Sequence, residues 1–166
     1  MPWIIREVQP DDAEALTHIL NPIIEAGTYT VLDTPFTPEA ERTFILNFPE
    51  RGIFHVAVDP TAQKVVGFQN IEPFASYTQA FDHVGIIGTY VDSSRRRQGV
   101  AAHLFQATFE AMQQKGYEKA FAYVRGDNLT ALATYLKHGF RIIGSAQKQA
   151  KIKGVYIDEI LIEKLL

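Results

Sequence analysis

Cysteine is absent from this chain of 166 residues. Its absence excludes disulfide bonds, thiolate nucleophiles and cysteine-ligated metal sites. Long apolar runs are also missing, because no stretch approaches the roughly 18 residues that a membrane span needs. The first residues, MPWIIREVQPDD, carry no basic segment followed by an apolar core. No secretory signal is therefore predicted, and a cytoplasmic location is expected.

An excess of positive charge is missing as well, since the formal net charge is -3. Nucleic-acid-binding domains usually carry a basic excess, so neither a nucleic-acid partner nor a membrane partner is expected. The apolar fraction of 46% and the charged fraction of 21% are ordinary for a soluble globular protein. The length suits one domain covering residues 1–166, without an internal repeat or a linker.

Apolar patterning predicts that strands and helices alternate along the chain. Strands are expected at 4–8, 53–58, 64–72, 84–91 and 119–124, and in a final pair at 141–150 and 155–165. Helices are expected at 13–20, 38–49, 99–116 and 128–140. Pro22 should disturb the first helix near its end. The order predicts an α/β fold: a single-domain, mixed, mostly antiparallel sheet flanked by helices, with one parallel step in the second half.

The segment SSRRRQGVAAHLF, residues 93–105, places three arginines and a glycine at the start of a predicted helix. The first four amides of a helix have no internal partner, and together with the helix dipole they attract anions. Gly99 removes the side chain that would keep a phosphate away from the backbone. Ala101 keeps the next turn narrow, and the arginines at 95–97 can pair with phosphate. Taken alone, the segment also fits a solvated basic loop before an ordinary helix.

Two patterns occur in a fixed order. RRQGVA, residues 96–101, fits Arg/Gln-x-x-Gly-x-Gly/Ala. NLTALATYLKHGF, residues 128–140, fits Asn-x-x-Ala-x-x-x-Tyr-x-x-x-Gly-Phe. The matching positions in the second pattern are Asn128, Ala131, Tyr135, Gly139 and Phe140. Together they resemble the GNAT superfamily of acyl-CoA-dependent N-acyltransferases, and the resemblance implies the GNAT fold, acetyl-CoA as co-substrate and no metal.

The resemblance also implies which residues bind the co-substrate. The pyrophosphate would be held by Arg96, Arg97, Gln98, Gly99, Val100 and Ala101. Backbone amides of Tyr90 and Val91 would bond the pantetheine and polarise the thioester carbonyl. Asn128 would bond the pantetheine arm as well. By spacing alone, Asn128 equally fits a helix N-cap, and Tyr90 and Val91 equally fit a buried strand.

Tyr135 is the catalytic residue that the resemblance implies, with its hydroxyl near the sulfur of CoA. A thiol of this kind has a pKa of about 8.5 and a phenol one of about 10. Full proton transfer to a free thiolate is therefore uphill, and we expect a hydrogen bond that strengthens as charge develops on sulfur. An ordinary core aromatic would fit the same position.

The N-terminal half and the closing segment KIKGVYIDEILIEKLL resemble one branch in particular, that of phosphinothricin acetyltransferase and related acetyltransferases of small amino acids. That branch usually carries a glutamate suited to act as base in the strand before YV, where this chain has Ile86. Glu72, Asp82, His83 or a water molecule are the alternatives for the base.

Acceptor specificity is expected from two loops, GTYTVLDTPFT at 27–37 and EPFASYTQAFDH at 72–83. Loops between structured elements are a usual place for binding residues. The aromatic residues that could line such a cleft are Tyr29, Phe36, Phe74 and Tyr77.

The sequence predicts an acetyl-CoA-dependent N-acetyltransferase that acetylates a primary amine of a small molecule, an amino acid or an analogue, by direct attack on the thioester. One alternative is a protein N-terminal or lysine acetyltransferase. Another is a CoA-binding domain without catalysis. A homodimer is a further expectation, because such dimers are common in the branch and the apolar segment YIDEILIEKLL offers a strand for pairing.

Overall fold

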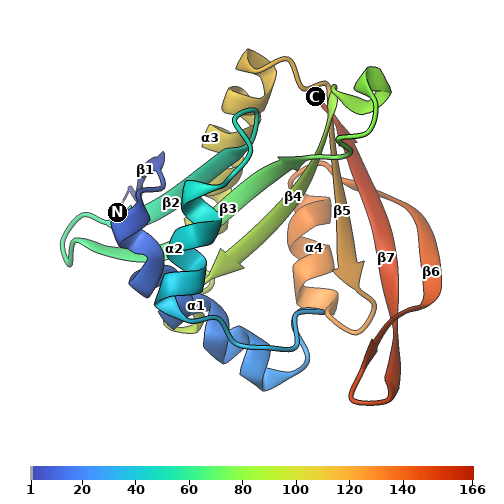
Figure 1. Ribbon diagram of the computed structural model, residues 1–166, viewed down its shortest axis with the longest axis horizontal. Coiled ribbons are helices and arrows are strands. Elements are labelled where there is room, and N and C mark those ends of the chain that lie inside the picture. The colour runs from blue at the N-terminus through green and yellow to red at the C-terminus, as the bar shows by residue number, and fades with distance from the viewer. Residues whose placement is uncertain (1) are drawn as a thin grey trace.

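The computed structural model describes residues 2–166, and seven strands form one sheet in the order β1-β2-β3-β4-β5-β7-β6 (Figure 1). The strands are β1 (Ile4–Glu7), β2 (Ile53–Asp59), β3 (Lys64–Pro73), β4 (Val84–Val91), β5 (Lys119–Arg125), β6 (Arg141–Ile152) and β7 (Val155–Leu165). The α-helices are α1 (Ala13–Ala26), α2 (Pro38–Leu46), α3 (Val100–Gln114) and α4 (Leu129–Lys137). Short 3-10 turns occupy Pro10–Asp12, Gln79–Phe81 and Ser93–Arg95.

Neighbouring strands run antiparallel except β4 and β5, which are parallel. The predicted α/β fold, with its mixed and mostly antiparallel sheet and one parallel step, is thereby confirmed. The final strand pair inserts β7 between β5 and β6, so the last strand of the chain lies inside the sheet. In the described part of the chain, no helix is both long and apolar enough to cross a membrane.

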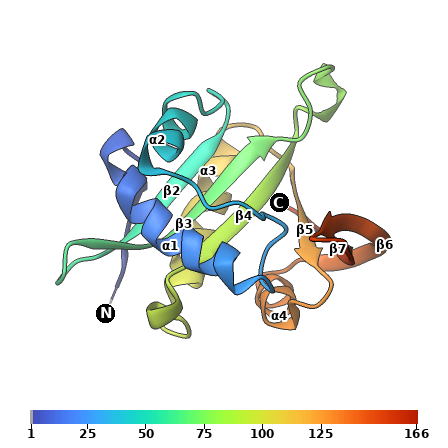
Figure 2. The same cartoon turned by 60° about the horizontal axis from the view of Figure 1, so that its bottom comes forward.

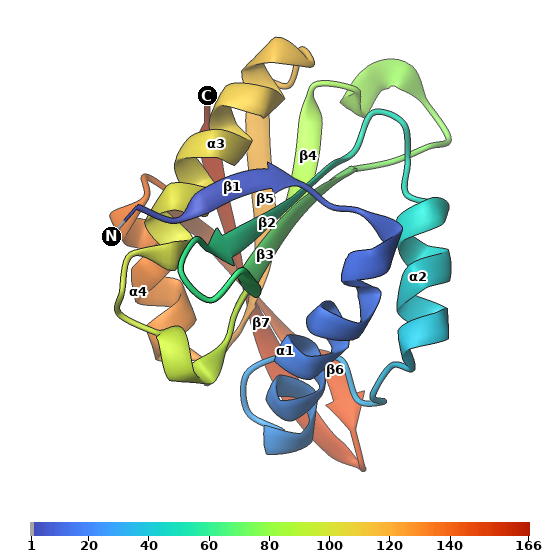
Figure 3. The same cartoon turned by 90° about the vertical axis from the view of Figure 1, so that its left-hand side faces the viewer.

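Helices cover both faces of the sheet, with α1 and α2 on one side and α3 and α4 on the other (Figures 2 and 3). On β3, Phe68 joins the cluster of α1, whereas Ile71 packs with Phe105 and Met112 of α3. An odd separation along a strand places two side chains on opposite faces, which is what this division requires. The two faces of the sheet therefore carry separate core clusters, and Ala57, Val66, Val100 and Leu104 form a third.

The pairing of β4 with β5 is short. Only Val84, Gly85 and Ile86 of β4 pair with β5, opposite residues 119–121, although both strands continue further. β4 remains paired with β3 along its length, and β5 remains paired with β7. The two strands therefore diverge towards their carboxyl ends, and α4 lies beside the opening (Figure 1).

The first helix differs from the sequence-based expectation. α1 runs through Pro22 to Ala26 and ends at Gly27, which adopts the left-handed conformation with φ 75°. Proline removes one hydrogen bond inside a helix. The buried side chains of Ile23 and Ile24 continue the apolar face beyond it, and packing of that face is what usually stabilises helices.

The buried stripe of α3 leaves Ala107 and Ala111 only half-buried. Its fully buried members are Val100, Leu104, Phe105, Thr108 and Met112. The two larger residues, Phe105 and Met112, turn the helix so that they fill the space above β3 and β5.

We expect Phe105→Ala to lower the free energy of unfolding by about 3–5 kcal/mol, because a large buried ring leaves a cavity. Phe105 is 1% exposed and contacts the rings of Tyr135 and His138. Urea denaturation measures the loss. Phe44→Ala, at a ring 41% exposed, is the matched control and should cost less than half as much. Equal losses would contradict the packing described here.

Candidate active site

The opening between β4 and β5 is lined by backbone groups of β4. The amide of Asp92 donates to the carbonyl of Val66 (2.8 Å), and the amide of Phe74 donates to that of Val84 (3.0 Å). Both bonds join β4 or its end to β3, so the even-numbered residues face β3. Backbone direction alternates along an antiparallel strand. The odd-numbered Ile87, Thr89 and Val91 therefore turn their amides towards the opening.

Of the two amides predicted to meet pantetheine, that of Val91 faces the opening and that of Tyr90 faces β3. The reason is that amide direction alternates along the strand, so two adjacent residues turn their amides to opposite sides. The ring of Tyr90 stacks on Phe68, with 5.0 Å between centroids, and so lies on the face that carries α1. Thr89, which the sequence did not single out, lies on the opposite face and turns its amide to the opening.

Tyr135 projects from α4 to the same strand. Its hydroxyl donates to Oγ1 of Thr89 (3.0 Å), and Nε2 of Gln69 donates to that oxygen as well (2.9 Å). Tyr135 is 8% exposed, and its ring packs edge-on against Phe105 and Phe140. Burial raises the pKa of the Tyr135 hydroxyl far above its ordinary value, although the bond to Thr89 opposes the shift. The hydroxyl therefore keeps its proton at neutral pH.

Gln69 is fully buried, and its Oε1 has no hydrogen-bond partner in the part of the chain that the structure describes. A buried carbonyl oxygen without a partner costs free energy, so such groups are rare and often functional. The side-chain NH2 of Gln69 thus orients the Thr89 hydroxyl, which in turn accepts the hydrogen bond of Tyr135.

The amino end of α3 is open. Gly99 is the N-cap, with φ 83°, and no side chain caps the first turn. A Cβ added at Gly99 would meet only ring atoms of His103, at 3.9 Å or more. The side chain of Val100 is buried and that of Ala101 half-buried, so both offer amides rather than side chains. This end fits a phosphate, because free amides and a positive dipole end meet no obstruction.

The three arginines before this helix have different surroundings. Arg95 forms an ion pair with Asp59 (2.7 Å), which ties the loop to the hairpin of β2 and β3. The guanidinium of Arg96 lies 4.7 Å from the ring centroid of Tyr29. Arg97 is exposed and adopts the left-handed conformation with φ 62°, which a residue with a side chain rarely does. Gln98 is exposed beside it.

Asn128 caps α4, as its position predicted. Its Oδ1 accepts from the amide of Ala131 (3.1 Å), and its Nδ2 donates to the carbonyl of Tyr29 (3.0 Å). Arg125 donates to the carbonyl of Thr30 (2.9 Å). The loop between α1 and α2 is therefore tied to the end of β5 and the start of α4 (Figure 2).

The three side chains considered as bases do not lie together. Asp82 and His83 are exposed and precede β4, and His83 is six residues from Thr89, about 20 Å along an extended strand. Glu72 of β3 is half-buried and lies directly opposite Ile86 in the β3–β4 register. The neighbouring strand therefore supplies a carboxyl beside the position where the branch carries its glutamate.

A further carboxyl, which the sequence analysis missed, belongs to α2. Glu41 is 4% exposed and shares the inner face of the helix with Ile45. It has no hydrogen-bond or ion-pair partner among residues 2–166, and burial raises the pKa of its carboxyl. Burial raises the pKa of the Tyr90 hydroxyl, a hydrogen bond with Thr30 opposes the shift, and the negative charges of Glu41 and Glu72 add to it. The signal in the sequence was the spacing: Glu41 precedes Ile45 by four residues, which places both side chains on one face of a helix.

The four loop aromatics are dispersed. The backbone of Phe36 is held by the side-chain amide of Asn21, and Phe74 packs edge-on against Phe121 of β5. Tyr77 is 82% exposed. Phe74 is therefore the member of the 72–83 loop that reaches the sheet beside the opening.

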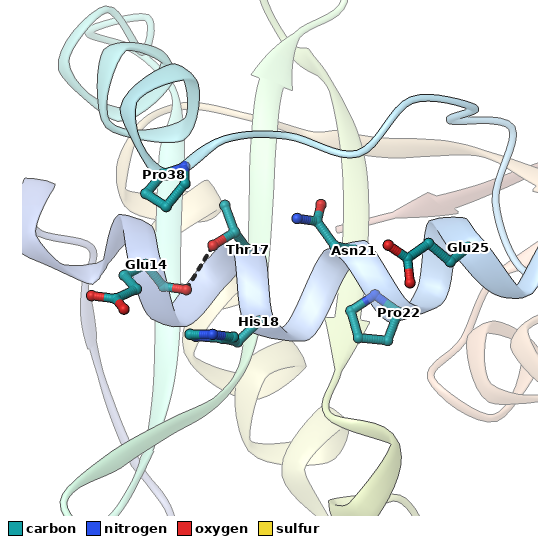
Figure 4. Close-up of a pocket in the computed structure, with 7 residues that line it drawn as sticks. All are labelled: Glu14, Thr17, His18, Asn21, Pro22, Glu25 and Pro38. Atoms are coloured by element: carbon teal, nitrogen blue, oxygen red, sulfur yellow. Dashed lines mark hydrogen bonds between the residues drawn. The ribbon is translucent and has the colours of Figure 1, made fainter.

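A surface pocket of about 330 Å³ lies elsewhere, along the outer side of α1 (Figure 4). It is lined by Glu14, Thr17, His18, Asn21, Pro22, Glu25 and Pro38. None of these residues belongs to the opening between β4 and β5. Over the described residues 2–166, no group of three or more histidine or acidic side chains could hold a metal ion.

The sequence that forms the opening, the uncapped helix and Tyr135 also matches a known family. A model described as the acetyltransferase (GNAT) family matches residues 15–140. The chain belongs to this GNAT family. GNAT relatives include the phosphinothricin N-acetyltransferase of Streptomyces coelicolor, which is 25% identical over 164 residues, 98% of this chain and 95% of that protein.

Solved GNAT structures share the fold. The acetyl-CoA complex of a GNAT superfamily phosphinothricin acetyltransferase from Sinorhizobium meliloti has a TM-score of 0.90 at 18% identity, over 100% of this chain and 89% of that one. The ribosomal-protein-alanine N-acetyltransferase of Brucella melitensis reaches 0.89 at 23% identity, over 98% and 99%. The predictions of an N-acetyltransferase, of acetyl-CoA as co-substrate and of likeness to the phosphinothricin branch are confirmed.

We expect Gly99→Glu to raise the Kd for acetyl-CoA at least about 10-fold, because a carboxylate would stand at the phosphate-binding amides. Gly116→Glu is the matched control, since Gly116 has φ 87° and open space around its Cα. Both variants should lose a similar stability of about 1–2 kcal/mol from left-handed strain. Calorimetric titration measures the affinity. An unchanged Kd for Gly99→Glu would remove this helix end from the binding site.

Glu41→Gln should raise the melting temperature at neutral pH. A carboxyl whose folded pKa is raised stabilises the protein below its unfolded value of 4.5, and this contribution is lost as pH rises through the folded pKa. The gain should therefore shrink towards about pH 4. Glu39→Gln, on the exposed side of the same helix, should change little. Equal melting curves for both variants would contradict the burial of Glu41.

Proposed function

We propose that this N-acetyltransferase, a single domain over residues 1–166, acetylates the primary amine of a small molecule by direct attack on the thioester of acetyl-CoA. The observation that carries the proposal is the divergence of β4 from β5 with the Tyr135 hydroxyl bonded to Thr89 inside it. Free strand amides, a neutral proton donor and an open helix end thus follow one another along a single path.

The residues that would hold acetyl-CoA lie on this path. Its pyrophosphate would take the amides at the start of α3 and the guanidinium groups of Arg96 and Arg97, with Gln98 beside them. Its pantetheine would take the amides of Thr89 and Val91. Asn128 would give up its bond to the Tyr29 carbonyl and donate Nδ2 instead. The ring of Tyr90 would form part of the surface that contacts the acceptor, on the face of the sheet that carries α1.

Acetyl-CoA, when bound, supplies the acetyl group as an activated thioester. Residues of the chain would then remove a proton from the amine and donate one to the leaving sulfur. An α-amino group has a pKa of about 7.7–8.0 and is partly neutral at physiological pH, so it needs only weak base assistance. Glu72, opposite Ile86, would accept a proton from the amine directly or through water. Tyr135 would donate to sulfur late, because its own pKa is raised.

We expect Tyr135→Phe to lower kcat at least about 100-fold and to change the KM for acetyl-CoA far less, because the hydroxyl acts on the leaving sulfur. Steady-state release of free CoA measures both constants. Tyr77→Phe, at an exposed tyrosine, is the control and should match the wild type. An unchanged kcat for Tyr135→Phe would remove Tyr135 from the chemistry.

A screen of amines by free-CoA release tests the function directly. The expected result is turnover of at least one small primary amine. Calorimetric binding of acetyl-CoA without turnover of any amine would instead support the alternative of a CoA-binding domain without catalysis.

A further inference from the structure

On the face of the sheet that carries α1 and α2, the carboxyl groups of Glu41 and Glu72 have no ion-pair partner in the described part of the chain. Glu41 is more than nine-tenths buried there and has no partner within residues 2–166. A buried polar group is ordinarily hydrogen-bonded, and a buried charge is ordinarily paired. Glu41 is therefore placed to receive a partner that comes from outside the chain.

Its surroundings are rich in oxygen. Phe68, Asn70 and Glu72 are every second residue of β3, so their side chains lie on one face of the sheet. Phe68 stacks with Tyr90 on that face. Asn70 lies opposite Gly88, and its Oδ1 is 3.2 Å from where a Cβ of Gly88 would stand. The missing side chain leaves room over β4 beside this oxygen. Glu72 lies one pair further along, opposite Ile86.

Within residues 2–166, no ion pair forms with the carboxyl of Glu41 or of Glu72. The charged groups that act on the Tyr90 hydroxyl are Glu41 and Glu72, both acidic. Arg125, at the end of β5, is committed to Asp127 through two bonds and to the carbonyl of Thr30 through a third. Its cross-strand neighbour Glu159 is buried and, like Glu41, has no partner in the described chain.

The cations further along the same sheet are also used. Lys119 and Arg141 both pair with Glu163. An acceptor with a carboxylate would therefore bring a negative charge beside the unpaired carboxyls of Glu41 and Glu72, and the nearby cations Arg125, Lys119 and Arg141 are already bonded within the described residues. A like charge without a partner in a partly buried site is strongly disfavoured.

We infer that Glu41 and Glu72 bind the ammonium group of the acceptor, and that the acceptor is an amine without a carboxylate. Free amino acids and their anionic analogues, which the sequence led us to expect as acceptors, are then poor substrates, whereas their amides and decarboxylated amines are good ones. This inference rests on the proposed function and names its acceptor class.

The chemistry balances with these residues. Of the three protons on the bound ammonium, one passes to a carboxylate of the Glu41–Glu72 pair, which frees the lone pair of nitrogen. The N–C bond forms as the C–S bond breaks, and the electron pair of that bond goes to sulfur. A second nitrogen proton reaches sulfur by way of the Tyr135 hydroxyl, and the third remains in the amide product.

The test compares matched acceptors. For leucine, leucinamide and 3-methylbutylamine, and for the corresponding series of other amino acids, kcat/KM is measured by free-CoA release. We expect the amide and the amine to exceed the acid at least about 10-fold in every series that reacts, since each lacks the repelled charge. Equal or better turnover of the free acid would overturn the inference. A peptide preferred over every small amine would overturn the small-molecule acceptor as well.

Variants of α2 localise the effect. Glu41→Gln should lower kcat/KM for the amine at least about 10-fold, shrink its advantage over the acid and leave the Kd for acetyl-CoA unchanged, because the lost contact is to the acceptor. Glu39→Gln removes the same charge from the exposed side of the helix and should leave all three unchanged. Unaltered discrimination in Glu41→Gln would overturn the role of Glu41. Failure of the proposed function is recognisably different, because no series would then release CoA.

Discussion

The structure depends on one unequal pairing: β4 keeps β3 as a partner along its whole length and loses β5 after Ile86. Each strand is held by its other neighbour, so the two are kept apart from both sides. The backbone amides of β4 that would bond to β5 in a regular sheet therefore remain available beyond Ile86. An extended ligand can accept hydrogen bonds from these amides in place of a neighbouring strand. An open sheet can bind a chain-like molecule in this way without a deep cavity.

The two faces of this opening differ in charge. On the side of α3 and α4, Tyr135 is buried and neutral; its hydroxyl donates to Thr89, and Gln69 donates to the same Thr89 oxygen. On the side of α1 and α2, Glu41 is buried, and no residue among 2–166 pairs with its carboxyl. An unpaired buried polar group costs about 1–3 kcal/mol, and the ammonium of the proposed acceptor would offset that cost. In the proposed reaction, the proton donor Tyr135 and the carboxyls of Glu41 and Glu72 would meet the reacting groups from opposite sides of β4.

Backbone conformation prepares the phosphate end. Arg97 and Gly99 both adopt positive φ, and the glycine tolerates this without strain while the arginine does not. The loop between α1 and α2 lies over the same region, through Tyr29 against Arg96 and through the Tyr29 carbonyl on Asn128. Local strain at Arg97 is thus found beside the helix end that the ligand would occupy.

Local patterns in the sequence determined the order of strands and helices, the helix start at Gly99, the cap at Asn128 and the position of Tyr135. The elements, the helix start and the cap follow from periodicity or capping within a few residues of chain, and Tyr135 follows from the resemblance to the GNAT pattern. Only the tertiary structure decided that Glu72 lies beside Ile86, that Asp82 and His83 lie far from Thr89, that α1 continues through Pro22, and that Glu41 is buried near Tyr90. Strand register and helix packing join residues distant in sequence, and no local pattern encodes where such partners meet.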